Sequence, residues 1–134
     1  FLVGGTASTN EALRITSSEM VGIATATPQA KLDVGGSFKL GAAGTVLAGV
    51  VKNNVVINDA TLFNYTTTRQ ITVTVTGATV NGTVIVSPRT ALAAGLNIAW
   101  ARVSAANTVI IAFTNTDTVL KSIGNITFDV TVIQ

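Results

Sequence analysis

Carboxylates are the side chains of this sequence that could perform acid–base chemistry. Glycosidic bond hydrolysis needs two carboxyl groups held at a set separation across the substrate. Six carboxylates scattered over 134 residues could bring two together in any fold, so their number alone does not indicate an active site. Asp33 and Asp129 lie where polar and apolar residues alternate, and we expect both to face solvent. We therefore expect that the protein is not an enzyme. None of its carboxylates is expected to be catalytic; they are Glu11, Glu19, Asp33, Asp59, Asp117 and Asp129.

The composition and short motifs of the sequence exclude several further kinds of catalytic, metal and cofactor site. The sequence has no Cys and no His, which excludes disulfides, thiol nucleophiles, Ser–His pairs, and thiolate or imidazole zinc sites. The oxygen-rich segment 115–117 lacks the Asp-x-Asp spacing and bidentate Glu of a calcium loop, so a turn explains it better. The glycine pairs in GGTAS (4–8) and VGGS (34–37) lack the Lys-Ser/Thr of a phosphate loop. We expect no metal and no cofactor.

Two aromatic residues and one cation form the candidate contact site. Trp100 and Tyr65 are the single Trp and the single Tyr, and such rings often contact sugars or proteins. Trp100 stands between Ile98 and Val103 in a strand-like stretch, which favours a core position, whereas Tyr65 lies in a Thr-rich stretch. Arg102 shares the face of Trp100 if the strand is regular. The receptor-contact hypothesis therefore rests on Tyr65, Trp100 and Arg102.

The distribution of basic residues and the length of the apolar runs argue against nucleic acid and the membrane interior as partners. Net charge is +2, and the eight basic residues are spread without a cluster, whereas nucleic-acid binding needs a concentrated basic surface. Apolar runs are only a few residues long, far short of the ~20 that a membrane helix needs. We expect neither nucleic-acid binding nor membrane insertion. The chain begins at Phe1 with no signal peptide, so we expect a processed product, a fragment, or a chain without its beginning.

Residue composition predicts an all-β protein. Thr, Val and Ile occupy 51 positions, and β-branched residues fit a pleated, half-buried surface better than a helix. We place a division near residues 41–45, giving segments 1–44 and 45–134. In the second segment, alternating strands and regular turns predict an antiparallel β-sandwich with jelly-roll or Greek-key order. We expect strands over 45–58, 69–76, 82–87, 97–104, 108–114 and 126–133, a weaker one over 61–66, and one helical turn over 89–96.

The first segment contains strands too short to form a core. Apolar and polar residues alternate around Leu13, Val21, Leu32 and Phe38, and Gly or Pro interrupts each run. Two-stranded hairpins are marginal in water, so such strands need additional partners. Several copies wound about an axis would supply these partners, but an N-terminal arm packed on the sandwich of its own chain fits the pattern equally well.

Residues 10–40 resemble the shaft motif of phage tail fibres and related fibre proteins. There, a strand of the form N-x-A-L-R-I-T precedes V-G-I-G-T-x-x-P-x-A-K-L-D-V-x-G. This sequence departs at Ala24, which replaces the second Gly of the motif, and at Glu19-Met20. The matching residues are Ala12, Leu13, Arg14, Ile15, Thr16, Val21, Gly22, Ile23, Thr25, Pro28, Ala30, Lys31, Leu32, Asp33, Val34 and Gly36.

The resemblance implies a homotrimeric shaft, residues 1–44, that leads into a β-sandwich head, residues 45–134. The head also resembles, more weakly, a β-sandwich module of phage and bacterial surface proteins, which implies architecture alone. We predict that the shaft chains meet through Leu13, Ile15, Val21, Ile23, Leu32, Val34, Phe38 and Leu40.

The expected function is that of a structural fibre or spike protein on the virion surface, partnered by itself, by other virion proteins, and by a host-surface glycan or protein. Two alternatives stay open. One is a bacterial surface or secreted adhesion module with a fibre-like stalk, and the other is a carbohydrate-binding subunit. Oligomeric state and glycan binding would separate these classes.

Overall fold

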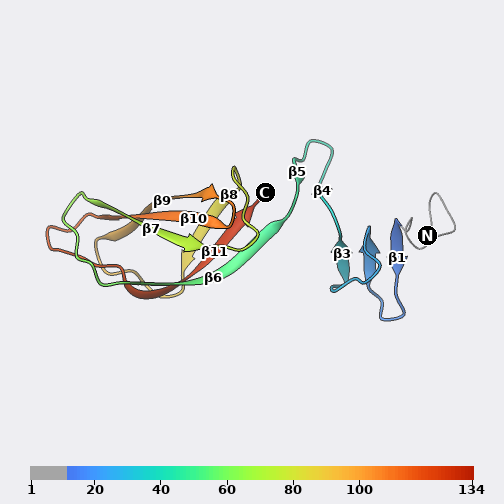
Figure 1. The fold of residues 1–134 in the computed structure, drawn as a ribbon, viewed down its shortest axis with the longest axis horizontal. Helices are drawn as coiled ribbons and strands as arrows, with labels where there is room; N and C mark the ends of the chain where they lie inside the picture. The colour runs from blue at the N-terminus through green and yellow to red at the C-terminus, as the bar shows by residue number, and fades with distance from the viewer. Residues whose placement is uncertain (1–11) are drawn as a thin grey trace. The chain divides into compact units, whose positions relative to one another are not determined.

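The computed structural model describes residues 12–134 and consists of strands and loops, with no helix in that range (Figure 1). This confirms the predicted all-β class. The chain forms two compact units, the first ending at Gly49 and the second running over Val50–Gln134. Asn10 and Glu11, at the start of the motif, and the glycine pair of GGTAS lie outside the described residues.

The first unit contains five very short strands. Three of them form one sheet in the order β1-β2-β3, in which β2 pairs antiparallel with β1 and parallel with β3. The other two form an antiparallel ladder. Their bounds are β1 Leu13–Ile15, β2 Val21–Ile23, β3 Leu32–Val34, β4 Phe38–Lys39 and β5 Val46–Leu47.

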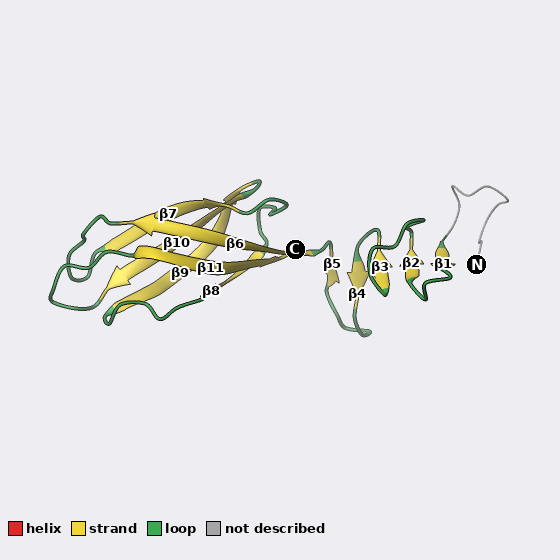
Figure 2. Cartoon of the chain, turned by 90° about the horizontal axis from the view of Figure 1, so that it is seen from below, coloured by secondary structure: helices red, strands yellow, loops and turns green. Residues whose placement is uncertain are grey.

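The second unit is a sandwich of two antiparallel sheets, with strand orders β6-β11-β8 and β7-β10-β9 (Figure 2). The last two strands of the sequence are the central ones: β11 lies in the middle of the first sheet and β10 in the middle of the second. Only β9 and β10 pair as a hairpin of consecutive strands, while β6, β7, β8 and β9 alternate between the sheets. The bounds are β6 Val50–Asp59, β7 Thr68–Thr74, β8 Thr83–Pro88, β9 Leu96–Ala105, β10 Thr108–Asn115 and β11 Gly124–Ile133.

Three details differ from the sequence predictions. The strand expected over 45–58 is two strands, β5 and β6, separated by Ala48 and Gly49. The weak strand expected over 61–66 is reduced to one bridge between Phe63 and Lys121. The helical turn expected over 89–96 is absent: Leu96 donates its N–H to the Ala93 carbonyl in a turn and then begins β9.

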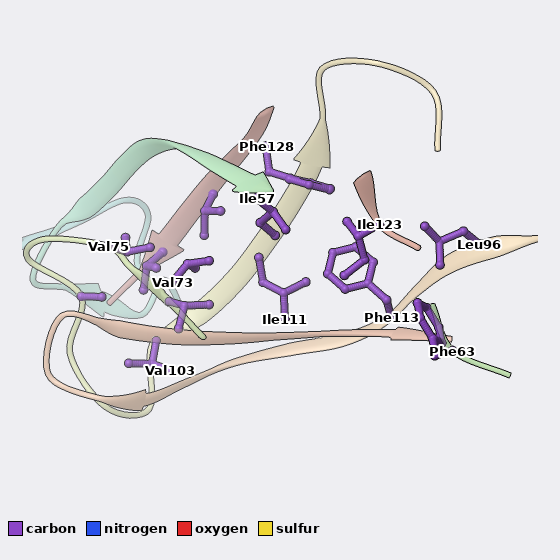
Figure 3. Close-up of a cluster of buried hydrophobic side chains, with 14 residues drawn as sticks. Ile57, Phe63, Val73, Val75, Leu96, Val103, Ile111, Phe113, Ile123 and Phe128 are labelled. Carbon is purple, nitrogen blue, oxygen red and sulfur yellow. The ribbon is translucent and has the colours of Figure 1, made fainter. Parts of the chain in front are cut away.

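The core lies between the two sheets and follows the alternation of the strands (Figure 3). On β7, Ile71 and Val73 point inward, while Thr72 between them is exposed. Two phenylalanines from different sheets meet edge to face, Phe113 of β10 and Phe128 of β11, with ring centroids 5.6 Å apart at 63°, a geometry that favours aromatic pairs. The largest fully buried side chains are Phe113, Phe128, Ile111, Val75, Val109, Val130, Val132 and Asn115.

A buried amide and an ion pair complete the sandwich. Asn115 donates from Nδ2 to the carbonyls of Phe63 (3.0 Å) and Val119 (2.9 Å), and its Oδ1 accepts from the Asp117 N–H (2.9 Å). Asp59, at the end of β6, accepts from Nε of Arg69 on β7 at 2.6 Å, and so links the two sheets. The hydrogen bonds of Asn115 thus hold segment 115–117, which we predicted to be a turn rather than a calcium loop.

Candidate functional site

The first unit leaves its apolar side chains uncovered. From residue 12 to residue 49, only Gly22 and Pro28 are buried, and neither belongs to the large apolar side chains of the strands. Ile15 is 71% exposed, Leu32 62% and Leu40 77%. By contrast, all fifteen buried hydrophobic residues of the described chain lie at Ile57 or beyond. This unit has the apolar residues of a core but does not form one from a single chain.

Glycine spacing explains how the motif folds back on itself. A Cβ on Gly22 would lie 2.6 Å from the Thr25 carbonyl oxygen, and one on Gly35 would collide with the Ala24 carbonyl oxygen. The loop over residues 24–31 therefore needs both glycines to return tightly enough for β2 and β3 to pair. Buried Pro28 fills the inside of this loop against Gly22.

Polar residues of the motif hold the turns. Asp33 Oδ2 accepts from the Gln29 N–H at 2.9 Å, within the return loop. Lys31 reaches the turn between β1 and β2, where its Nζ donates to the Ser18 carbonyl at 3.2 Å and lies 3.5 Å from Glu19 Oε2. Lys31 and Asp33 are thus engaged in local structure, whereas the large apolar side chains of the strands remain exposed or half-buried.

An apolar groove continues this surface. It has a volume of about 430 Å³, and no charged residue lines it. Leu32, Val34, Phe38 and Leu40, all predicted to contact neighbouring chains, lie along it. Sequence reasoning missed Ala48 and Gly49, which also line the groove, because the predicted strand over 45–58 placed them inside a sheet.

The second candidate surface depends on a β-bulge in β9. Ile98 pairs with Phe113 and Trp100 pairs with Ala112, so Ala99 is the extra residue of this strand. Because one inserted residue moves every later side chain to the other face, Trp100 points outward. It is 41% exposed, and the prediction of a core Trp100 was wrong. Ala101 and Val103 take the inward positions that follow.

Trp100 and Arg102 share one face of the sheet. Between Val109 and Ala112 the register with β9 is regular, and Arg102 pairs with Ile110 as Trp100 pairs with Ala112. Tyr65 is placed elsewhere, in the turn before β7, where Thr67 donates its N–H to the Asn64 carbonyl. It is exposed. The structure thus unites two of the three predicted contact residues and leaves Tyr65 apart.

Ion pairing distinguishes Arg102 from the other cations of the sandwich. Arg89 lies 2.9 Å from Asp129, which also faces Lys52, and Lys121 lies 2.9 Å from Asp117. With the Arg69–Asp59 pair, four of the five cations of the sandwich have a carboxylate partner. Among the described residues, the side chain of Arg102 has no hydrogen bond or ion pair.

The carboxylates of the sandwich are held in these pairs. The hydrogen bond from Arg69 lowers the pKa of Asp59 to about 2 against the effect of burial. The hydrogen bond from Lys121 lowers the pKa of Asp117. Burial opposes ionisation of Asp129, but hydrogen bonds from Arg89 and Lys52 outweigh it and lower its pKa. None of the three has the raised pKa of a general acid, and each has a structural partner.

Comparisons and further searches add no assignment. No protein-family model, no curated protein and no solved structure matches the chain. Within residues 12–134, no helix is long and apolar enough to span a membrane. In that same range, no three potential metal ligands among the carboxylates cluster around one point.

Proposed function

We propose that the protein is a structural fibre or spike protein of a virus particle, in which the first unit assembles as a homotrimeric shaft and the sandwich forms a head. One observation carries the assembly: the apolar side chains of residues 12–49 are exposed or half-buried, and no strand of the same unit covers them. Burying a large aliphatic side chain is worth about 1.5–3 kcal/mol. Repeated copies of this surface would provide the missing core.

The choice of three chains and of a virion rests on the resemblance of residues 10–40 to the shaft motif of phage fibres. The structure adds support in local detail. Gly22 and Gly35 are sterically required, Pro28 is buried, and Lys31 and Asp33 hold turns. Of these residues, Gly22, Pro28, Lys31 and Asp33 belong to the motif, whereas Gly35 does not. The spacing of the motif residues therefore has a physical function in this chain.

Light scattering of the purified full chain tests the assembly, with a mass of three chains expected. A matched pair of variants locates the interface. Ile15→Lys changes a 71% exposed residue of β1 and Ile85→Lys a 52% exposed residue of β8. In an isolated chain both are mild, but in a trimeric shaft only Ile15→Lys places a charge inside the interface. A monomeric wild type, or equal behaviour of the two variants, would refute the proposal.

Attachment to a host surface is the proposed role of the head. The exposed Trp100 beside the unpaired Arg102 supports it, because Trp and Arg are enriched among residues that dominate binding. The same observation supports the alternative of a carbohydrate-binding subunit. Oligomeric state separates the two, since a monomer that binds glycan fits only the alternative.

A further inference from the structure

The outer face of the sheet β7-β10-β9 carries polar side chains that have no partner among the described residues. Trp100 and Arg102 are consecutive on this face, about 7 Å apart along β9. The register carries Trp100 across Ala112 to Gln70, and Arg102 across Ile110 to Thr72. Among the described residues, the side chains of Gln70 and Thr72 form no hydrogen bond with the protein. The face is therefore an exposed ring, a free guanidinium and free amide and hydroxyl groups on a rigid sheet.

The charge of this face favours an anionic partner. Its accessible residues include no carboxylate, and Arg102 is its only charged group; the residues are Thr68, Gln70, Thr72 and Thr74 of β7, Asn97, Ala99, Trp100 and Arg102 of β9, and Thr108, Ile110 and Thr114 of β10. Ala112 faces the same side between Gln70 and Trp100 but is fully buried.

The side-chain carboxylates of residues 12–134 do not supply the matching anion, in this chain or in a second copy of it. Asp59, Asp117 and Asp129 are paired with cations of their own chain. Glu19 faces Lys31, and Asp33 accepts a backbone hydrogen bond. Every carboxylate of residues 12–134 is thus engaged. An anion for Arg102 therefore comes from outside these residues.

We infer that this face binds a carboxylate-bearing sugar unit of a surface polysaccharide. The C–H side of a pyranose ring is apolar and matches the exposed indole of Trp100. A sugar carboxylate accepts two parallel N–H bonds from a guanidinium, which gives Arg102 a partner of the correct charge and shape. Gln70 and Thr72 lie two strands away, about 10 Å across the sheet, where they meet hydroxyl groups of the adjoining sugar units of the polymer. This inference deepens the attachment part of the proposed function and rests on it.

Binding of the full chain to immobilised polygalacturonate, hyaluronate and polysialate tests the inference, with methyl-esterified polygalacturonate as the uncharged counterpart. We expect binding to at least one acidic polymer and at most weak binding to the ester. Trp100→Ala and Arg102→Gln should each weaken binding by about tenfold or more. Raising NaCl from about 50 to about 500 mM should also weaken it, because the ion pair is exposed.

Two variants are matched controls. Arg89→Gln removes an Arg of the other sheet that is paired with Asp129, and Tyr65→Ala removes an exposed aromatic outside this face. Both should retain wild-type binding. The inference is overturned if none of the three acidic polymers binds, or if the ester binds equally. It is also overturned if Trp100→Ala and Arg102→Gln bind like wild type, or if Tyr65→Ala loses as much binding as Trp100→Ala.

Light scattering of the same samples separates this inference from the proposed function. A trimer that binds no acidic polymer refutes only the glycan surface, whereas a monomer refutes the fibre even if it binds. Trp100→Ala and Arg102→Gln change exposed positions, and circular dichroism checks their fold. The salt dependence of the wild type needs no variant at all, so the charge component is tested even if a substitution perturbs folding.

Discussion

Asn in place of Asp59 should weaken the sandwich in a way that depends on pH. Asp59 accepts a hydrogen bond from Arg69 Nε at 2.6 Å and another from the Thr61 N–H at 2.9 Å. Arg69 Nη2 also donates to Thr61 Oγ1 at 3.2 Å. This small network joins β6 of one sheet to β7 of the other. The hydrogen bond from Arg69 is the main reason that the pKa of Asp59 falls from the ordinary 3.8 to about 2.

The direction of the pH effect follows from proton linkage. A carboxyl group with a lower pKa in the folded state binds fewer protons when folded, so its stabilisation is complete above the unfolded pKa and is lost as the pH falls through the folded pKa. A change from 3.8 to about 2 corresponds to at most roughly 2.5 kcal/mol. Arg69 is 36% exposed, whereas Asp59 is 12% exposed, and solvent screening reduces the expected contribution to about 1–2 kcal/mol.

Thermal unfolding of the full chain at pH 7 and pH 3 measures this contribution. Trp100, the single Trp, reports on the sandwich, and Asp59→Asn should lower its melting temperature at pH 7 by on the order of 5–10 °C. At pH 3 roughly half of the difference from wild type should remain. Asp33→Asn, a carboxylate of the first unit, is the control and should leave the sandwich transition unchanged. A difference of the same size at both pH values, or none at pH 7, would refute the reasoning.

Three further substitutions test the remaining structure. Ala24 has φ of 54°, a conformation that costs an L-residue about 1 kcal/mol, so Ala24→Gly should raise the melting temperature of the first unit; a lower one would contradict the loop conformation. Gly22→Ala should destabilise the first unit by about 1–3 kcal/mol, because its Cβ meets the Thr25 carbonyl oxygen, and unchanged melting would argue against the tight return loop. Asn115→Ala removes three hydrogen bonds and should cost about 2–4 kcal/mol in urea unfolding, whereas a cost under about 1 kcal/mol would show that the loop finds other partners.

Local alternation was sufficient to predict most strands. The apolar face of Ile71 and Val73 on β7, and of Phe128 and Val130 on β11, is visible in the sequence because one-sided burial imposes a period of two residues. The break between β5 and β6 was not predicted, since Val46 to Val51 reads as one apolar run. In the structure, β5 pairs with β4 and ends at Leu47, and β6 begins at Val50, so Ala48 and Gly49 lie outside both strands.

Position 24 of the motif has a steric explanation. The fibre motif has a Gly there, and the neighbouring residue types do not by themselves explain why. The positive φ of Ala24 supplies the reason, because glycine adopts this conformation without a Cβ penalty. Ala24 therefore introduces local strain at one position of this loop.

The contact surface could be predicted only in part, and the cause is the bulge at Ala99. Counting by twos from Ile98 places Trp100 in the core, because strict alternation assumes an unbroken ladder. The register with β10 breaks that assumption, and a single extra residue turns the indole outward beside Arg102. Gln70 and Thr72 join them from a strand about 30 residues earlier, through pairings that alternation along one strand cannot reveal. Bulges often serve to redirect a side chain, and here the redirected residue is the single Trp of the protein, placed next to the one unpaired cation of the sandwich.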